Sequence, residues 1–214
     1  QARLNSSRLP GKMLMDIGDK TLLEKVIEGV STAKKVTKIV VATSQRETDD
    51  ALVTLCESIG IEYYRGDLDN VLDRLINTCE YYGYNSFIRI NGDSPLISGK
   101  VIDDVVSVYE GLSIKSFATN VNPRSFPKGL SVEVLNLSFL KRIYLETDLK
   151  SVEKEHVTSV IYDKYPNCNN YVSSVDLSAL NFCVDESSDY HFIKALFEHI
   201  DTSSFIDTLI FGNR

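Results

Sequence analysis

Three basic residues stand close together at the start of the chain, in the stretch QARLNSSRLPGK. Arg3, Arg8 and Lys12 have no acidic residue among them, although the protein has a formal net charge of -7. Guanidinium groups pair bidentately with phosphate oxygens, and lysine supplies a mobile point charge. The small polar residues Asn5 and Ser6 permit tight turns whose backbone N–H groups can face an anion. The stretch predicts a site for a small polyanion, with a solvated basic loop as the alternative.

Two later stretches place a carboxylate where an apolar strand is expected to end. In FIRINGDSPLI the strand ends just before Asp93, and in NFCVDESSDY another ends just before Asp185. Ligands of open α/β sheets bind at the carboxyl ends of the strands. Mg²⁺ takes one or two protein carboxylates while it bridges to phosphate. The pattern favours a metal site made by these two residues beside the basic loop, and a turn that caps the next helix is the alternative for each.

The elements that must position these residues alternate in type along the first half of the chain. Apolar residues at helical spacing and short buried apolar runs predict helices over 22–30, 49–58, 69–82 and 99–110, and strands over 38–43, 61–64 and 86–91. Such alternation implies right-handed crossovers and a mainly parallel central sheet with helices on both faces. The predicted fold class is therefore α/β and Rossmann-like.

The second half has a different pattern, with a β-rich excursion at about 113–170. Apolar patterning from there to residue 199 predicts strands over 116–120, 129–136, 171–177 and 180–185, and helices over 138–146, 152–165 and 189–199. Since no long polar linker interrupts the chain, we expect residues 1–214 to form a single domain. The basic motif at Gln1 would normally come after a buried strand, so we also expect a first strand that this chain lacks.

Composition limits the classes of partner. The chain is 43% hydrophobic and 25% charged, which is typical of a globular protein. Its acidic balance argues against nucleic acid and against an anionic membrane as partners. The sequence contains no apolar run of about 18 residues, the length that would indicate a membrane span. The 4 cysteines lack CxxC spacing, and with only 3 histidines they indicate neither a zinc site nor a disulfide framework. Reduced thiols in a cytoplasmic protein are the expectation.

Five stretches together carry a resemblance to a known family. QARLNSSRLPGKML, FIRINGDSPLI, FPKGLSVEV, KEHVT and CVDESSDY occur here in the order in which similar blocks occur in the cytidylyltransferases that activate acidic sugars. The chain most resembles the spore-coat polysaccharide type, which is related to acylneuraminate and 3-deoxy-manno-octulosonate cytidylyltransferases. The resemblance implies a nucleotide-diphospho-sugar transferase fold, Mg²⁺ as cofactor and a homodimer. It also implies that CTP and a small sugar acid give a CMP-sugar and pyrophosphate, for surface polysaccharide synthesis.

The resemblance also implies roles for individual residues. The nucleotide-binding set is Arg3, Asn5, Ser6, Arg8 and Lys12, the catalytic set is Arg8, Lys12 and Asp93, and the metal ligands are Asp93 and Asp185. The sugar-binding set is Asn120, Lys128, Gly129, Glu133, Glu155 and His156. The excursion carries this sugar side and the expected dimer contacts. The chain departs from the family pattern at Ser131, Asn181 and Cys183, where similar sequences have aspartate, arginine and threonine, which leaves the identity of the sugar open.

Two other functions stay open on the sequence alone. A glycosyltransferase that consumes a nucleotide sugar can have the same fold, but such enzymes usually close a central strand with an acid-x-acid motif. Here the central strand ends in Asn91-Gly92-Asp93, which has one acid, and Asp67-Leu68-Asp69 is a weak substitute at the approach to a helix. A non-catalytic nucleotide-binding relic is the third hypothesis, motivated by the departures at Ser131 and Asn181.

Overall fold

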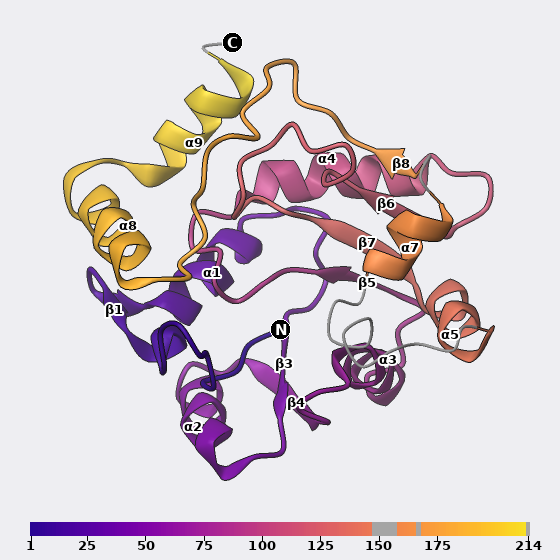
Figure 1. Cartoon of the computed structure of the whole chain (residues 1–214), viewed down its shortest axis with the longest axis horizontal. Coiled ribbons are helices and arrows are strands. Elements are labelled where there is room, and N and C mark those ends of the chain that lie inside the picture. Colours follow the sequence, from indigo (N-terminus) through magenta and orange to yellow (C-terminus); the bar gives the residue numbers. More distant parts are fainter. Residues whose placement is uncertain (147–157, 166–167, 213–214) are drawn as a thin grey trace.

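The computed structural model describes residues 1–146, 158–165 and 168–212, and Figure 1 shows its strands and helices. The first half contains η1 (Lys12–Leu14), β1 (Asp16–Ile17), β2 (Lys20–Thr21), α1 (Leu22–Ser31), β3 (Val40–Ser44), η2 (Glu47–Asp49), α2 (Asp50–Ser58), β4 (Glu62–Gly66), α3 (Val71–Tyr81), β5 (Ser86–Arg89) and α4 (Gly99–Glu110). The second half contains β6 (Phe117–Thr119), β7 (Glu133–Asn136), α5 (Leu137–Glu146), α7 (Ser159–Lys164), β8 (Asn169–Asn170), α8 (Ser187–His199) and α9 (Thr202–Phe211). The predicted α/β class is confirmed.

The strands run in mixed directions, parallel and antiparallel, rather than mainly parallel. β3 pairs with β4 in parallel, and β5, β7, β6 and β8 pair in that order. β7 runs antiparallel to both of its neighbours, whereas β8 is parallel to β6. The reason lies in the connections, since a helical crossover through α4 makes β5 and β6 parallel. The loop from β6 to β7 contains no helix, so β7 returns in the opposite direction between them.

The first two residues join the two groups of strands at their carboxyl ends. The amino terminus of Gln1 donates to the Ile90 carbonyl at 2.9 Å, and the Ala2 N–H donates to the Ala42 carbonyl at 3.1 Å. A cavity of about 390 Å³ lies between the same strands and is lined in part by Val41 and Ile88. The strand expected before Gln1 stays a prediction. The observed hydrogen bonds place the basic loop at the carboxyl edge of β3 and β5.

Helices cover both faces of the strands, as expected. Val134 of β7 belongs to a buried cluster with residues of α1 and α4, such as Val26 and Ile102. The next residue, Leu135, belongs to a second cluster with residues of α3 and α5, such as Leu72 and Leu140. Because successive strand residues point to opposite faces, β7 is buried on both. Figure 1 shows α4 on one side of β7, and α3 and α5 on the other.

Polar residues fix where the helices begin. Thr21 and Glu24 form a capping box at α1, in which the Thr21 side chain accepts from the Glu24 N–H and the Glu24 carboxylate accepts from the Thr21 N–H. Asn70 caps α3 and Ser98 caps α4 by accepting from a backbone N–H of the first turn. These local signals explain why the helix boundaries agree closely with the predicted ones.

The strands predicted over 171–177 and 180–185 are wrong. Their backbone groups form no ladder with one partner strand and instead make single hydrogen bonds to loops. The Leu177 N–H donates to the Ser125 carbonyl, the Lys128 N–H to the Leu180 carbonyl and the Val184 N–H to the Asp93 carbonyl. Without a continuous ladder, the apolar side chains of Val172 and Val175 remain 55% exposed. The predicted helix over 152–165 is present as α7, and the rest of it lies outside the described residues. No described helix has the length and apolar character needed to cross a membrane.

Candidate active site

The basic loop is a compact turn between Leu4 and Lys12. The N–H groups of Ser6 and Gly11 donate to the Leu4 carbonyl at 2.9 and 3.0 Å, and the Leu9 N–H donates to Ser6 Oγ at 3.3 Å. Gly11 has a φ of 72°, in the left-handed region that glycine adopts without a steric penalty. The next residue, Lys12, begins η1. The turn therefore directs Lys12 back under the loop, whereas Arg8 lies at its exposed side.

A buried aspartate anchors the loop to β3. Asp49 is fully buried and accepts from the Leu4 N–H at 2.8 Å, from the Ser44 N–H at 3.3 Å and from Thr43 Oγ1 at 3.3 Å, as well as from the Ser44 hydroxyl. Sequence reasoning missed this residue, because an aspartate at the start of a helix is ordinarily an exposed cap. Four donors to one carboxylate compensate for its burial.

Asp49→Ala is expected to lower the free energy of unfolding by about 3 to 5 kcal/mol, because it leaves the buried N–H of Ser44 and the partly buried N–H of Leu4 without an acceptor. Asp50→Ala is the matched control, since the neighbouring carboxylate is 58% exposed and pairs with Arg65 at 2.7 Å. That change should cost less than about 1 kcal/mol. Urea denaturation monitored by circular dichroism measures both. Equal losses in the two variants would contradict the anchoring role.

Lys12 joins three segments that are distant in the sequence. Its ammonium Nζ donates to Asp93 Oδ2 at 3.0 Å, to Asp185 Oδ1 at 3.1 Å and to the Val184 carbonyl at 2.7 Å. The Lys12 side chain is only 6% exposed, whereas the two carboxylates are 23% and 32% exposed. The structure thus brings together the predicted loop lysine and both predicted metal ligands. The carboxylates remain open to a ligand, but the ammonium is enclosed.

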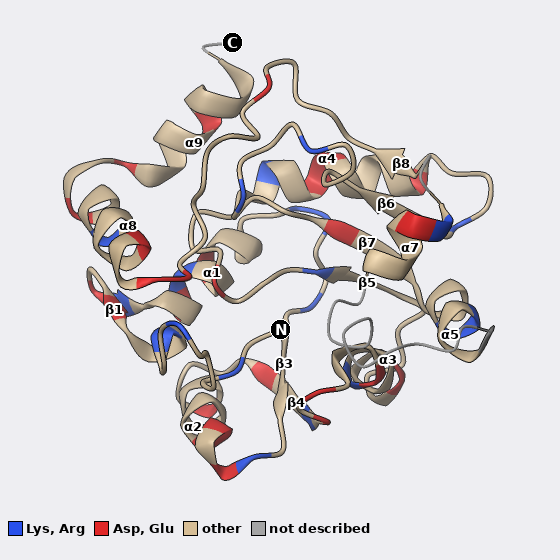
Figure 2. Cartoon of the chain, viewed as in Figure 1, with Lys and Arg blue, Asp and Glu red and all other residues tan. Residues whose placement is uncertain are grey.

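Arg8 approaches the same carboxylates from the solvent side. Its Nη2 lies 3.0 Å from Asp185 Oδ1 and its Nη1 lies 3.9 Å from Glu186 Oε1. The side chain is 57% exposed, so it can move toward a larger anion at little cost. Figure 2 shows the blue residues of this loop beside the red segment that leads into α8. Arg3 is partly buried, and its charge acts on the buried Arg74 guanidinium.

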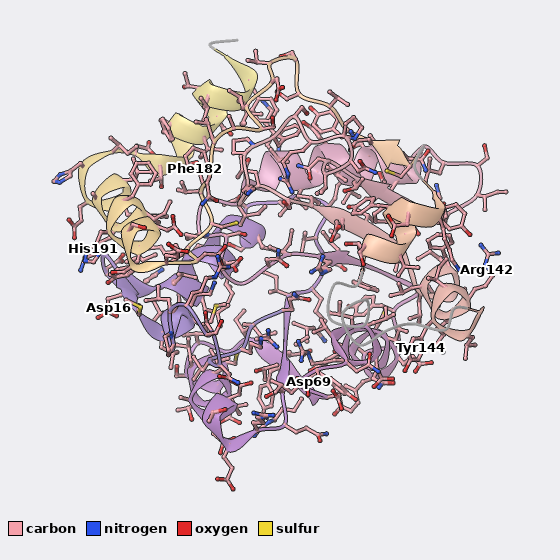
Figure 3. The ribbon with its side chains drawn as sticks, viewed as in Figure 1. Asp16, Asp69, Arg142, Tyr144, Phe182 and His191 are labelled. Carbon is pink, nitrogen blue, oxygen red and sulfur yellow. The ribbon has the colours of Figure 1, made fainter. Side chains whose placement is uncertain are left out.

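The segment that carries Asp185 is held by a cap and by a close backbone approach. The N–H groups of Asp185 and Glu186 donate to Asp189 Oδ2 at 3.0 and 2.9 Å. Glu186 is therefore the N-cap of α8, and Asp189 in the first turn completes its capping box. A Cβ on Gly129 would lie 2.7 Å from the Phe182 carbonyl carbon, and its φ of 94° is left-handed. Figure 3 shows Phe182 where this segment approaches α9.

Asp93 and Asp185 fit a magnesium ion as ligands. Their carboxylate oxygens converge on one cationic atom, the Nζ of Lys12, at 3.0 and 3.1 Å. No group of three or more histidine, cysteine, aspartate or glutamate side chains suited to a metal occurs in the described part of the chain. Two carboxylates match Mg²⁺, which keeps several waters and takes other oxygens from substrate phosphates. The donor set suits a metal that arrives with a polyphosphate.

A second cavity adjoins this cluster through Asn91, two residues before Asp93. It has a volume of about 160 Å³ and is lined by Arg89, Asn91, Val121, Arg124, Ser131, Glu133, Thr158 and Tyr162. Arg89 forms an ion pair with the buried Glu133, and the Tyr162 hydroxyl donates to Glu133 Oε1 at 2.5 Å. Burial and the Glu133 charge raise the pKa of Tyr162 well above its usual range, so this hydroxyl keeps its proton.

The residues predicted for the sugar side are placed differently from one another. Glu133 lines the second cavity. Asn120 is fully buried, and its amide bonds to the Leu130 carbonyl at 2.7 Å and to the Val132 N–H at 2.8 Å, so it holds the loop before β7. Lys128 is exposed and makes an isolated bridge with Asn181. The predicted Glu155 and His156 lie outside the described residues.

Four other polar residues make no hydrogen bond to Lys12 in the described part of the chain. Asn5 is exposed on the basic loop. His191, which Figure 3 labels on α8, is also exposed, and its Nδ1 lies 2.6 Å from the Ser187 carbonyl in the first turn of that helix. Burial and the Asp93 charge raise the pKa of the Cys183 thiol to about 12, so this sulfur carries no charge near neutral pH. The Asp67 carboxylate accepts from the N–H groups of Asp69 and Asn70, as a turn residue before α3 does.

Sequence reasoning missed four residues of the second cavity. Arg89, Asn91 and Tyr162 lie within predicted elements, where each reads as an ordinary strand or helix residue. Arg124 stands in the loop VNPRSFPKG, whose two prolines indicate a defined conformation. The arginine in this proline-containing loop is the sequence feature that could have indicated the cavity. Its partner in space, Ser131, is evident only from the structure.

Comparison with known proteins gives a family match and several relatives. A family model described as cytidylyltransferase matches residues 1–202. The chain is 32% identical over 206 residues to an uncharacterised protein of Methanocaldococcus jannaschii, covering 94% of this chain and 82% of that one. It is 29% identical over 214 residues to the spore coat polysaccharide biosynthesis protein SpsF of Bacillus subtilis, covering 92% and 84%. The identity to the 3-deoxy-manno-octulosonate cytidylyltransferase of Bdellovibrio bacteriovorus is 22%, covering 90% and 72%.

Solved structures agree with the fold. A cytidylyltransferase from Leptospira borgpetersenii matches with a TM-score of 0.89 and 26% identity, covering 97% of this chain and 89% of that one. The structure of CMP:2-keto-3-deoxy-manno-octonic acid synthetase complexed with CTP matches with a TM-score of 0.68 and 18% identity, covering 92% and 95%. The second match shows the fold alone.

Proposed function

The chain belongs to the cytidylyltransferase family, and from this premise we propose that it uses CTP to convert a sugar acid of the octulosonic or nonulosonic type into its CMP-sugar, with release of pyrophosphate. The observation that carries the proposal is the convergence of Lys12, Asp93 and Asp185 at the carboxyl edge of the sheet. The spore-coat and octulosonate relatives support a role in surface polysaccharide synthesis. The family match favours this reaction over glycosyl transfer and over a non-catalytic relic.

The residues of the basic loop hold and neutralise the triphosphate. In the transfer, a sugar hydroxyl attacks the α-phosphorus in line and pyrophosphate leaves. Such reactions depend mainly on positioning and on neutralisation of charge. Arg8, which is exposed, turns from Asp185 to the phosphates, and the enclosed Lys12 neutralises the leaving pyrophosphate. Asp93 and Asp185 would hold Mg²⁺, which supplies Lewis-acid polarisation of the phosphate when bound. The second cavity, next to Asp93, receives the sugar.

Pyrophosphate release is the direct test of this function. We expect the protein with CTP, Mg²⁺ and a panel of octulosonic and nonulosonic acids to release pyrophosphate and to form the CMP-sugar, detected by mass spectrometry. ATP, GTP and UTP are the nucleotide controls. Sugar transfer from a CMP- or UDP-sugar would instead indicate the glycosyltransferase, and CTP binding without turnover the relic. The homodimer and the cytoplasmic location are further proposals from the family resemblance, to be checked by sedimentation and by fractionation of cells.

A further inference from the structure

The second cavity contains one cation whose charge no side chain of the described residues offsets. Of its two arginines, Arg89 pairs with Glu133, so these two charges cancel. Arg124 instead donates through Nη1 and Nη2 to Ser131 Oγ at 3.1 and 3.2 Å, and through Nη1 to the Pro127 carbonyl at 3.4 Å. Both acceptors are neutral, and no carboxylate among the described residues pairs with Arg124. The cavity wall therefore has a net positive charge.

The same cavity contains an acceptor without a donor. The side-chain oxygen of Asn91 is buried and has no hydrogen-bond partner among the described residues. A buried polar atom of this kind is costly unless a bound molecule or water satisfies it. A hydroxyl group can donate to it. Arg124 and Asn91 together thus favour a ligand that combines an anionic group with a hydroxyl group.

The volume and the net charge of the cavity favour a carboxylate as the anionic group of the ligand. The cavity volume of about 160 Å³ is smaller than the pockets that enclose whole drug-sized ligands, which begin at about 300 Å³. It therefore takes one end of a substrate whose other end reaches Asp93. One surplus positive charge balances one carboxylate, and the guanidinium fork matches the two carboxylate oxygens. A phosphate group would bring up to two negative charges against this single cation.

We propose that Arg124 recognises the carboxylate of the sugar acid, and that Ser131 positions the guanidinium without neutralising it. The proposal rests on the proposed function, since the ligand is the acceptor of that reaction. It deepens that function by naming the residue that selects an acidic sugar over a neutral one. Arg89 is excluded from this role because its guanidinium is already paired with the Glu133 carboxylate.

Binding measurements on the intact chain test the proposal without turnover. The probes are 3-deoxy-manno-octulosonate and N-acetylneuraminate, each compared with its neutral C1 amide by ligand-observed NMR titration. The wild type should bind at least one acid about 10- to 100-fold more tightly than its amide, as a charged hydrogen-bond pair implies. Arg124→Gln removes the cation and should bring acid and amide close to equal affinity.

The control is Ser131→Asn, which changes the neutral partner of Arg124 without adding a charge and is expected to keep the preference for the acid. Circular dichroism and CTP binding check that each variant is folded. Equal binding of acid and amide by the wild type, a preference that survives Arg124→Gln, or binding of neither acid would overturn the proposal. A preference for the acid that depends on Arg124, with no pyrophosphate released from CTP by any sugar, would retain the role of Arg124 and reject the proposed function. Pyrophosphate release with acid and amide alike would retain the transfer reaction and reject the role of Arg124.

Discussion

Lys12→Ala is expected to lower kcat for pyrophosphate release by about a hundredfold to a thousandfold, the usual loss when one preorganised donor to developing charge is removed. The ammonium is enclosed and held by Asp93, Asp185 and the Val184 carbonyl, so it is positioned before the triphosphate arrives. Preorganised charge acts in the transition state without a cost of reorganisation. We therefore expect the loss in kcat rather than in KM alone.

The control for this variant is Lys25→Ala, since the Lys25 side chain in α1 is also largely buried and pairs with a carboxylate, but that carboxylate is the exposed Asp19 at 2.8 Å. Its kinetics should match those of the wild type. Steady-state measurements at saturating Mg²⁺ give kcat and the KM for CTP. An unchanged kcat with a raised KM would show that Lys12 only retains the substrate. Thermal unfolding of Lys12→Ala checks that the remaining carboxylates do not disrupt the fold by mutual repulsion.

Asp93→Asn is expected to lower kcat by about a thousandfold, corresponding to about 4 kcal/mol of lost stabilisation of the transition state. Asparagine keeps the size of the side chain and an oxygen acceptor, but it lacks the negative charge that holds Mg²⁺. Lys12 would retain its contacts with Asp185 and the Val184 carbonyl, so the fold should persist. A loss of activity can thus be assigned to the charge of one carboxylate.

Metal removal provides the matching measurement. Wild-type activity should be lost in EDTA and restored by added Mg²⁺, and Asp93→Asn should need a higher Mg²⁺ concentration for half its residual rate. Asp19→Asn, on the exposed partner of Lys25, is the control that should leave this dependence unchanged. The metal role of Asp93 would be rejected if Asp93→Asn retained both the rate and the Mg²⁺ dependence of the wild type.

Local physics explains why much of the fold can be predicted from the sequence. Apolar periodicity and caps such as Thr21 act over a few residues, and the predicted helices match α1, α2, α3 and α4 closely. The strands predicted over 171–177 and 180–185 were wrong because apolar and β-branched residues indicate a strand only where a partner offers a continuous ladder. The mixed order of the sheet escaped prediction for a related reason, since β7 inserts between two strands that are distant in sequence.

By itself, the sequence determined the α/β class, the basic loop, and the two aspartates that come after apolar segments. Only the tertiary structure decided that Lys12 lies between those aspartates, which are 81 and 173 residues away along the chain. It also decided that Asp49 is a buried anchor and that Arg124 has a neutral partner in Ser131. The physical reason is the same in each case. Residue type and spacing encode local conformation, whereas burial and charge pairing depend on which distant segments the packed core brings together.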